Sequence, residues 1–121
     1  MHYLFAGGGT AGHINPALAV AGYIKEREPD ARISYIGTAK KLEARLVPER
    51  GYDFYTIDVA GFQRKLSLKN IGRNICAAEK AVSSSFRAKA LLKKLKPDIV
   101  IGTGGYVSGP VVRAAQKLGI K

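Results

Sequence analysis

The sequence predicts an α/β domain built on a Rossmann-like, doubly wound parallel sheet. Short apolar runs rich in β-branched and aromatic residues alternate with segments of helical periodicity along the 121 residues. Strands separated by helices form βαβ units, which build a parallel sheet covered by helices on both faces. Two glycine-rich loops each follow a predicted strand and precede a predicted helix, as ligand-binding loops do in such sheets. A chain of this length fits one domain, so we expect residues 1–121 to form a single unit.

The predicted elements alternate in chain order. The strands cover residues 2–6, 32–36, 53–59 and 98–102, and the helices cover residues 16–28, 40–49, 70–95 and 109–118. We expect Asn15 to cap the first helix and Pro16 to take its first position, because the missing proline N–H would be unpaired there anyway. Pro97 is expected to end the third helix before the fourth strand.

The net charge of +11 is concentrated in one part of the chain. Residues 1–61 hold seven basic and seven acidic residues, whereas residues 62–96 hold ten basic residues and one acid. This asymmetry indicates a polyanionic partner, such as nucleic acid, a membrane surface or a phosphate-rich substrate. A single cysteine, Cys76, excludes an internal disulfide and is typical of a reducing compartment. We expect no secretory signal, because no basic segment leads into an apolar stretch after the initial Met-His-Tyr. We expect no membrane span either, because no apolar run approaches the roughly 20 residues that a span needs.

The first glycine-rich loop, GGGTAGHINP at residues 7–16, contains the G-x-G-x-x-G spacing of dinucleotide-binding domains. Bare backbone N–H groups and the positive end of the following helix favour an anion there. The dinucleotide fingerprint also requires an acid at the end of the second strand, where residues 36–38 read Ile-Gly-Thr. NAD is therefore disfavoured, and only Lys40 and Lys41 leave an NADP-dependent oxidoreductase fragment open as an alternative.

The second glycine-rich loop, GTGGYVSGP at residues 102–110, follows the fourth predicted strand and also leads into a helix. Two such loops at the carboxyl ends of parallel strands can face one cleft. Two helix amino-termini would then converge there, which suits a diphosphate better than a single phosphate. The sequence has no Asp-x-Asp pair, so we expect neither a metal site nor a cofactor.

Three stretches, GGGTAGHINPALAVA, YIGTAKKLEARLVPERGY and KPDIVIGTGGYVSGP, resemble the MurG family of glycosyltransferases. The resemblance extends over essentially all 121 residues, with Ala11 and Lys41 at positions where the family often has glycine. Members of this family move N-acetylglucosamine (GlcNAc) from UDP-GlcNAc to undecaprenyl-diphosphate-linked muramyl-pentapeptide, or lipid I, in peptidoglycan synthesis. The resemblance implies the amino-terminal, acceptor-binding half of a two-domain GT-B enzyme, without the carboxyl-terminal half that holds most donor contacts. We therefore expect this chain alone to be inactive and to be part of a longer transferase or a subunit of a split one.

The resemblance also implies roles for individual residues. The acceptor hydroxyl would attack the anomeric carbon with inversion, and His13 would be the general base. Histidine titrates near pH 6.5, and a helix amino-terminus favours the neutral ring, which can accept a proton. The alternative is that His13 only holds the loop in shape, and His2 is expected to be structural. The residues implied beside the donor are Thr10, Ala11 and Gly12, and those implied beside the acceptor diphosphate are Gly104, Gly105, Tyr106 and Ser108.

Residues 61–75, GFQRKLSLKNIGRNI, interleave apolar and basic side chains. An apolar surface with a basic rim is typical of a contact with an anionic membrane surface, and a lipid-linked acceptor would require one. We expect peripheral docking on the cytoplasmic face of the inner membrane through Phe62, Arg64, Lys65, Leu66, Leu68, Lys69 and Arg73. The basic stripe at Arg73, Lys80, Arg87 and Lys94 is equally explained as a solvated helix face. A nucleic-acid partner is not expected, because it would leave both glycine loops unexplained and no reading motif is present.

Overall fold

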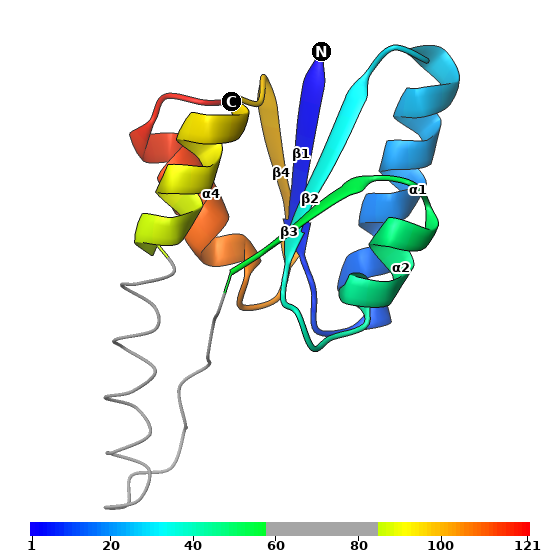
Figure 1. Cartoon of the computed structure of the whole chain (residues 1–121), viewed down its shortest axis with the longest axis horizontal. Helices are drawn as coiled ribbons and strands as arrows, with labels where there is room; N and C mark the ends of the chain where they lie inside the picture. Colours follow the sequence, from blue (N-terminus) through cyan, green and yellow to red (C-terminus); the bar gives the residue numbers. More distant parts are fainter. Residues whose placement is uncertain (58–84) are drawn as a thin grey trace, which may run out of the picture.

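A four-stranded parallel sheet forms the centre of the computed structural model, which describes residues 1–57 and 85–121 (Figure 1). Its strands are β1 (His2–Gly7), β2 (Arg32–Gly37), β3 (Asp53–Thr56) and β4 (Ile99–Gly104). They lie in the order β3-β2-β1-β4, and every neighbouring pair is parallel. The chain therefore runs from β1 through β2 to β3 at one edge of the sheet, and then crosses to β4, which pairs with the other side of β1. The carboxyl ends of β1 and β4 flank this switch point, where open α/β sheets bind ligands.

Helices cover both faces of the sheet, which confirms the predicted doubly wound architecture (Figure 1). The helices α1 (Ala11–Arg27) and α2 (Glu43–Glu49) lie on one face. The other face carries α4 (Ser108–Lys117) and the helical residues 85–95. None of the helices in the described part of the chain is long and apolar enough to cross a membrane.

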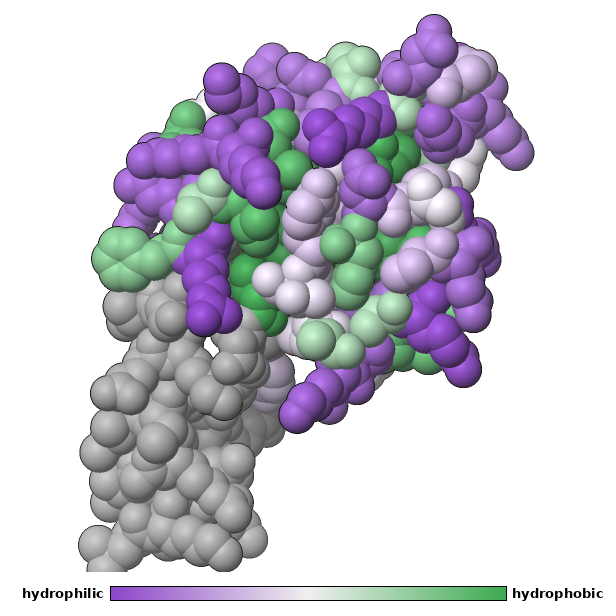
Figure 2. Space-filling model, in the orientation of Figure 1, coloured by the Kyte–Doolittle hydropathy of each residue, from purple (hydrophilic) through white to green (hydrophobic). Residues whose placement is uncertain are grey.

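The described residues form two apolar core clusters, one on each face of the sheet. Phe5 of β1 packs in one cluster with Ile14 of α1, and Leu4 packs in the other with Val111 of α4. All six residues of β1 are buried, because a strand in the middle of a parallel sheet is covered on both sides. On the outside of the molecule, hydrophilic side chains predominate over the upper part of the face in Figure 2. The buried strand β1 and the two apolar clusters support the loops at the carboxyl edge of the sheet.

The first helix begins earlier than the sequence predicts. The backbone of Thr10 is extended (φ −139°, ψ 157°), and its carbonyl accepts the N–H groups of His13 (3.1 Å) and Ile14 (3.2 Å). These bonds start α1 at Ala11, so Asn15 is not its cap and Pro16 lies inside the helix. The prediction was wrong because a proline that suits a first turn does not exclude a helical turn before it. As a result, His13 belongs to the first turn of a helix rather than to a loop.

The other predicted boundaries differ by a few residues. The second predicted helix begins at Glu43 rather than at residue 40, and β4 covers Ile99–Gly104 rather than residues 98–102. The last residue of β3 is Thr56, and residues 58 and 59 of the predicted strand lie outside the described residues. The predicted helix over residues 70–95 is described from residue 85 onward. The expected membrane-docking residues, Phe62, Arg64, Lys65, Leu66, Leu68, Lys69 and Arg73, and also Cys76, lie outside the described residues.

Candidate functional site

The two glycine loops are in direct contact at the carboxyl edge of the sheet. The N–H of Gly8, after β1, donates a hydrogen bond to the carbonyl of Gly104, at the end of β4 (3.2 Å). A Cβ placed on Gly105 would collide with the carbonyl oxygen of Gly8. The expectation that the loops face one site is confirmed, because β1 and β4 are adjacent strands whose carboxyl ends coincide.

The imidazole of His13 lies against the backbone of the second loop. A Cβ on Gly104 would lie 2.6 Å from Cδ2 and 2.9 Å from Nε2 of this ring. Gly104 and Gly105 have positive φ angles of 115° and 88°, which favour glycine over any other residue. The second loop therefore needs glycine at these positions in order to receive the ring of His13.

The hydrogen bonds of His13 determine which ring nitrogen carries the proton. Nδ1 lies 2.9 Å from the carbonyl oxygen of Gly8 and 3.3 Å from Oγ1 of Thr10. A carbonyl oxygen can only accept, so the ring must donate from Nδ1. In the neutral ring, Nε2 then carries the free lone pair, and no described residue donates a hydrogen bond to it. A half-buried imidazole with a free Nε2 can accept a proton from a hydroxyl group.

Glu43, at the start of α2, is a site residue that the sequence did not identify. Its side chain is 0% exposed and links the loops after β1 and β2. Oε1 accepts the N–H of Gly9 (3.3 Å), and Oε2 accepts both the N–H (3.1 Å) and the hydroxyl (3.2 Å) of Thr38. A Cβ on Gly8 would collide with this carboxylate, and a Cβ on Gly37 would lie 2.5 Å from Cγ of Glu43. Gly8 and Gly37 therefore make room for a protein carboxylate rather than for a phosphate.

At Gly8 and Gly9, these hydrogen bonds correct the expectation that the first loop presents bare N–H groups. The N–H of Gly8 is bound to the second loop, and the N–H of Gly9 is bound to Glu43. Both donors are satisfied within the protein. The carboxylate also affects Tyr35. Burial is the main cause that raises the pKa of Tyr35 to about 12, and the negative charge of Glu43 adds to that rise.

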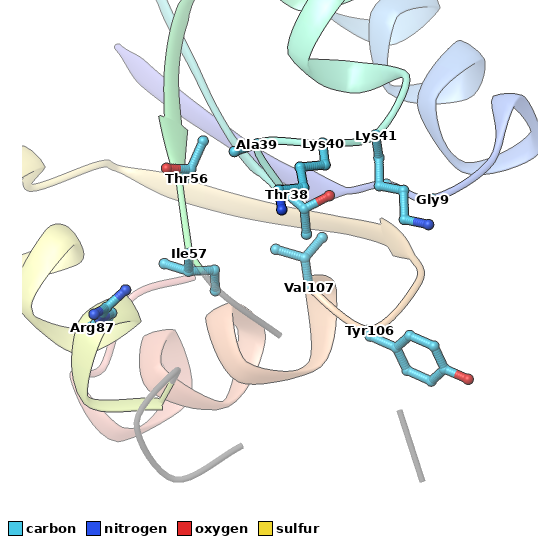
Figure 3. A pocket seen from close by; sticks show the side chains of 11 residues that line it. Gly9, Thr38, Ala39, Lys40, Lys41, Thr56, Ile57, Arg87, Tyr106 and Val107 are labelled. Atoms are coloured by element: carbon cyan, nitrogen blue, oxygen red, sulfur yellow. The ribbon is translucent and has the colours of Figure 1, made fainter. Parts of the chain in front are cut away.

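A cleft of about 580 Å³ opens beside the first loop (Figure 3). Its walls are formed by the loop after β1, the loop after β2 and the end of β3, together with residues from the opposite face of the sheet. Three cationic side chains line it: Lys40 and Lys41 lie on one side and Arg87 on the other. No acidic side chain of the described residues lines the cleft. An anionic ligand is therefore favoured there.

The residues that the resemblance places beside the donor lie on the first turn of α1. Thr10, Ala11 and Gly12 are all exposed, and the Thr10 hydroxyl also contacts His13. Among non-glycine residues in the described ranges, only Lys96 has a positive φ (49°). Alanine at position 11 and lysine at position 41 therefore fit without the strain that a glycine-specific conformation would cause.

The residues that the resemblance places beside the acceptor divide into two groups. Gly104 and Gly105 lie under the ring of His13, whereas Tyr106 is 70% exposed and lines the cleft. Ser108 begins α4, and its N–H donates to the carbonyl of Gly105 (3.3 Å). The structure thus brings His13 together with the glycines, and it places Tyr106 at the cleft.

Two other observations concern groups away from the cleft. His2 is buried, with Nδ1 3.2 Å from the Leu95 carbonyl and Nε2 2.7 Å from Oγ of Ser34, in agreement with a structural role. Burial lowers its pKa below the usual 6.5. In residues 1–57 and 85–121, no group of three His, Cys, Asp or Glu residues is placed to hold a metal ion.

Solved structures with this fold define the class of protein. The chain superimposes on the crystal structure of MurG from Acinetobacter baumannii with a TM-score of 0.79 and 35% identity, covering 98% of this chain and 33% of that one. It shares the fold of a UGT transferase from Siraitia grosvenorii solved in complex with UDP (TM-score 0.57, 13% identity, covering 98% of this chain and 26% of that one). The architecture is therefore that of an amino-terminal Rossmann-like half of a GT-B glycosyltransferase.

The family follows from the sequence itself. The glycosyltransferase family 28 N-terminal domain matches residues 3–121, and the chain belongs to this family. It is 55% identical over 120 residues to the UDP-N-acetylglucosamine--N-acetylmuramyl-(pentapeptide) pyrophosphoryl-undecaprenol N-acetylglucosamine transferase of Ruminiclostridium cellulolyticum. It is 48% identical over 120 residues to the protein of the same name from Pediococcus pentosaceus. In both cases the alignment covers 99% of this chain and 32% of the relative, so the chain spans about a third of these proteins. Membership of a glycosyltransferase family removes the oxidoreductase alternative.

Proposed function

We propose that this chain is the acceptor-binding half of an inverting transferase that moves GlcNAc from UDP-GlcNAc to undecaprenyl-diphosphate-linked muramyl-pentapeptide. The names of its relatives support the donor and the acceptor. The observation that carries the proposal is the ring of His13, which is held between two glycine loops with Nδ1 at the carbonyl of Gly8, so that in the neutral ring Nε2 carries the free lone pair. A base in this state is what a hydroxyl nucleophile requires.

His13 takes up the proton that the nucleophile loses. The sugar hydroxyl of the acceptor attacks the anomeric carbon of GlcNAc, and a new glycosidic bond forms. The bond between that carbon and the UDP oxygen breaks, and UDP leaves with the electron pair. The hydroxyl proton moves to Nε2 of His13, while Nδ1 stays bound to the carbonyl of Gly8. Attack from the face opposite UDP inverts the anomeric centre.

The cationic cleft receives the diphosphate of the acceptor. Lys40, Lys41 and Arg87 surround it, and charge-assisted hydrogen bonds to phosphate oxygens are stronger than neutral ones. Tyr106, which is exposed at the same cleft, is available to contact the acceptor sugar. The cleft adjoins the first loop through Gly8 and Gly9, so a bound diphosphate lies next to the loop that orients His13.

The experiment that tests the proposal is the substitution His13→Ala in the complete transferase that carries this chain. We expect kcat to fall by about 10²–10⁴-fold, the range for loss of a general acid–base group, while the KM for the acceptor changes much less. The assay is the transfer of radiolabelled GlcNAc to a lipid-linked acceptor in detergent. An unchanged kcat with a raised KM would make His13 a binding or loop-shaping residue.

The proposal includes peripheral docking on the cytoplasmic face of an anionic membrane through residues 61–75. Its support is the interleaved sequence pattern, since attraction to an anionic leaflet amounts to about 1 kcal/mol per Lys or Arg near the surface. Vesicles containing anionic lipid are expected to retain the chain at low salt and to release much of it at high salt. Changing Arg64, Lys65 and Lys69 together to Ser is expected to abolish most retention. Equal loss on changing Arg87 and Lys94 would instead indicate a diffuse charge effect.

A further inference from the structure

Glu43 is a buried carboxylate without a cationic partner in the described part of the chain. The ion pair formed within residues 1–57 and 85–121 joins Arg32 to Asp53, and the partners of Glu43 are three neutral donors on Gly9 and Thr38. Removing a charge from water is unfavourable by several kcal/mol, and an apolar side chain in its place is often no less stable. Stability alone therefore gives a weak reason for a carboxylate at this position.

The carboxylate and the imidazole of His13 are joined by a single peptide group. The Gly8–Gly9 peptide donates its N–H to Oε1 of Glu43 (3.3 Å) and accepts Nδ1–H of His13 at its carbonyl oxygen (2.9 Å). The peptide is trans, so its N–H and C=O point in opposite directions. Glu43 and His13 thus lie on opposite sides of one planar group, and any rotation of that group breaks both hydrogen bonds.

We propose that Glu43 is a positioning residue for His13 and acts through the Gly8–Gly9 peptide. The inference rests on the proposed function, in which His13 receives a proton at Nε2. A negative charge on the N–H side of the peptide polarises it and strengthens the carbonyl oxygen as an acceptor. That oxygen holds the proton on Nδ1 and fixes the ring plane, so Nε2 stays free. In many enzymes a carboxylate orients the catalytic base directly, and here a peptide is interposed.

No other carboxylate in the described residues is bonded to this loop. The remaining groups against the ring are the Thr10 hydroxyl and the backbone of the second loop at Gly104 and Gly105. The charged side chains of the adjoining cleft are the cations Lys40, Lys41 and Arg87. The hydroxyl of Thr10 can donate or accept, so it does not fix a tautomer. Within residues 1–57 and 85–121, Glu43 is therefore the charged group whose hydrogen bond specifies the orientation of the Gly8–Gly9 peptide.

The first measurement is the tautomer of His13 in the unmodified chain. The chain contains two histidines, His2 and His13, and ¹⁵N-labelled imidazoles give separate long-range ¹⁵N–¹H signals that the substitution His13→Ala assigns. In the neutral ring we expect the proton on Nδ1 of His13 and none on Nε2. A ring of His13 protonated on Nε2 would overturn the proposal without any variant of Glu43.

The second measurement compares Glu43→Gln with Glu49→Gln. Glu49 is an exposed residue of the same helix, so its variant makes the same change in charge away from the loop. A glutamine at position 43 has one acceptor oxygen, and its NH₂ group opposes the N–H of either Gly9 or Thr38. We expect Glu43→Gln to give a mixture of His13 tautomers, whereas Glu49→Gln keeps the Nδ1–H form. In the complete transferase we expect Glu43→Gln to lower kcat by up to about 100-fold, which is what a misplacement near 1 Å can cost, while the KM values change much less.

The outcomes separate this proposal from the proposed function. If Glu43→Gln mixes the tautomers but His13→Ala retains kcat, the positioning role holds and the assignment of His13 as base fails. If His13→Ala abolishes turnover but Glu43→Gln changes neither tautomer nor kcat, the proposed function stands and the role of Glu43 is wrong. Where Glu43→Gln does not fold, as judged by its amide spectrum, Glu43→Asp, which shortens the side chain and keeps its charge, is compared instead, and unchanged His13 tautomers with an unchanged kcat overturn the positioning role.

Discussion

Replacing Gly104 with alanine tests the central contact of the site, which is the packing of the His13 ring on the second glycine loop. At a φ of 115° a non-glycine residue is strained by about 1–3 kcal/mol. The new Cβ would lie 2.6 Å from Cδ2 of His13, whereas carbon atoms in contact are about 3.5–4.0 Å apart. The ring must therefore move by about 1 Å, and overpacking of this kind adds about 1–3 kcal/mol. We expect the free energy of unfolding to fall by about 2–6 kcal/mol and kcat to fall by about 10²-fold.

The matched control for this change is Gly22→Ala in the middle of α1. A Cβ on Gly22 meets no atom within 4 Å, and alanine is favoured over glycine inside a helix by about 0.5–1 kcal/mol. Urea denaturation followed by circular dichroism gives the stability of both variants, and transfer assays with the complete enzyme give kcat. If Gly104→Ala unfolds at the same urea concentration as the unmodified protein and keeps its turnover, the ring does not lie where the structure places it.

Two further predictions concern buried groups. A Cβ at position 8 collides with the Glu43 carboxylate, so Gly8→Ala is expected to lower the free energy of unfolding by about 1–3 kcal/mol. Urea denaturation measures this change, and an unchanged free energy of unfolding would show that the carboxylate moves freely. Burial lowers the pKa of His2, so between that lowered pKa and 6.5 the unfolded chain binds more protons than the folded one. Stability is therefore complete above pH 6.5 and falls as the pH falls through this window, by at most about 1.4 kcal/mol per pH unit. His2→Asn is expected to flatten this dependence in urea melts at pH 5–7, and an unchanged slope would assign it to other groups.

The fold could be predicted because alternation of apolar runs with helical segments reflects a repeating βαβ unit. That pattern fixes strand direction, and the strand order then places the two glycine loops side by side. The start of α1 could not be predicted from Pro16, since the helix begins where the extended backbone of Thr10 offers its carbonyl to two following N–H groups. Local preferences indicate which positions of a helix a residue tolerates. The hydrogen bonds formed in the folded chain decide at which residue the helix begins.

Glu43 could not be predicted as a site residue because its environment is set by tertiary contacts. An acid in the first turn of a helix is usually an exposed residue that interacts with the helix dipole. Here the same residue is fully buried, because Gly8 and Gly37, on two different loops, leave a space that its carboxylate fills. The sequence contains both glycines, but their common neighbour becomes evident only when β1 and β2 are paired.

The internal hydrogen bonds of the first loop change how a phosphate can be held at this site. A glycine-rich loop before a helix usually binds an anion through free N–H groups, yet those of Gly8 and Gly9 are engaged by the second loop and by Glu43. Under the proposed function, the peptide between Gly8 and Gly9 therefore serves to orient His13, and cationic side chains add to the attraction for a diphosphate. Lys40, Lys41 and Arg87 line the adjoining cleft, and in the proposed function they neutralise the charge of the diphosphate. In the proposed function the proton is transferred to the ring of His13, whose hydrogen-bonded partners, the Gly8 carbonyl and the Thr10 hydroxyl, are neutral.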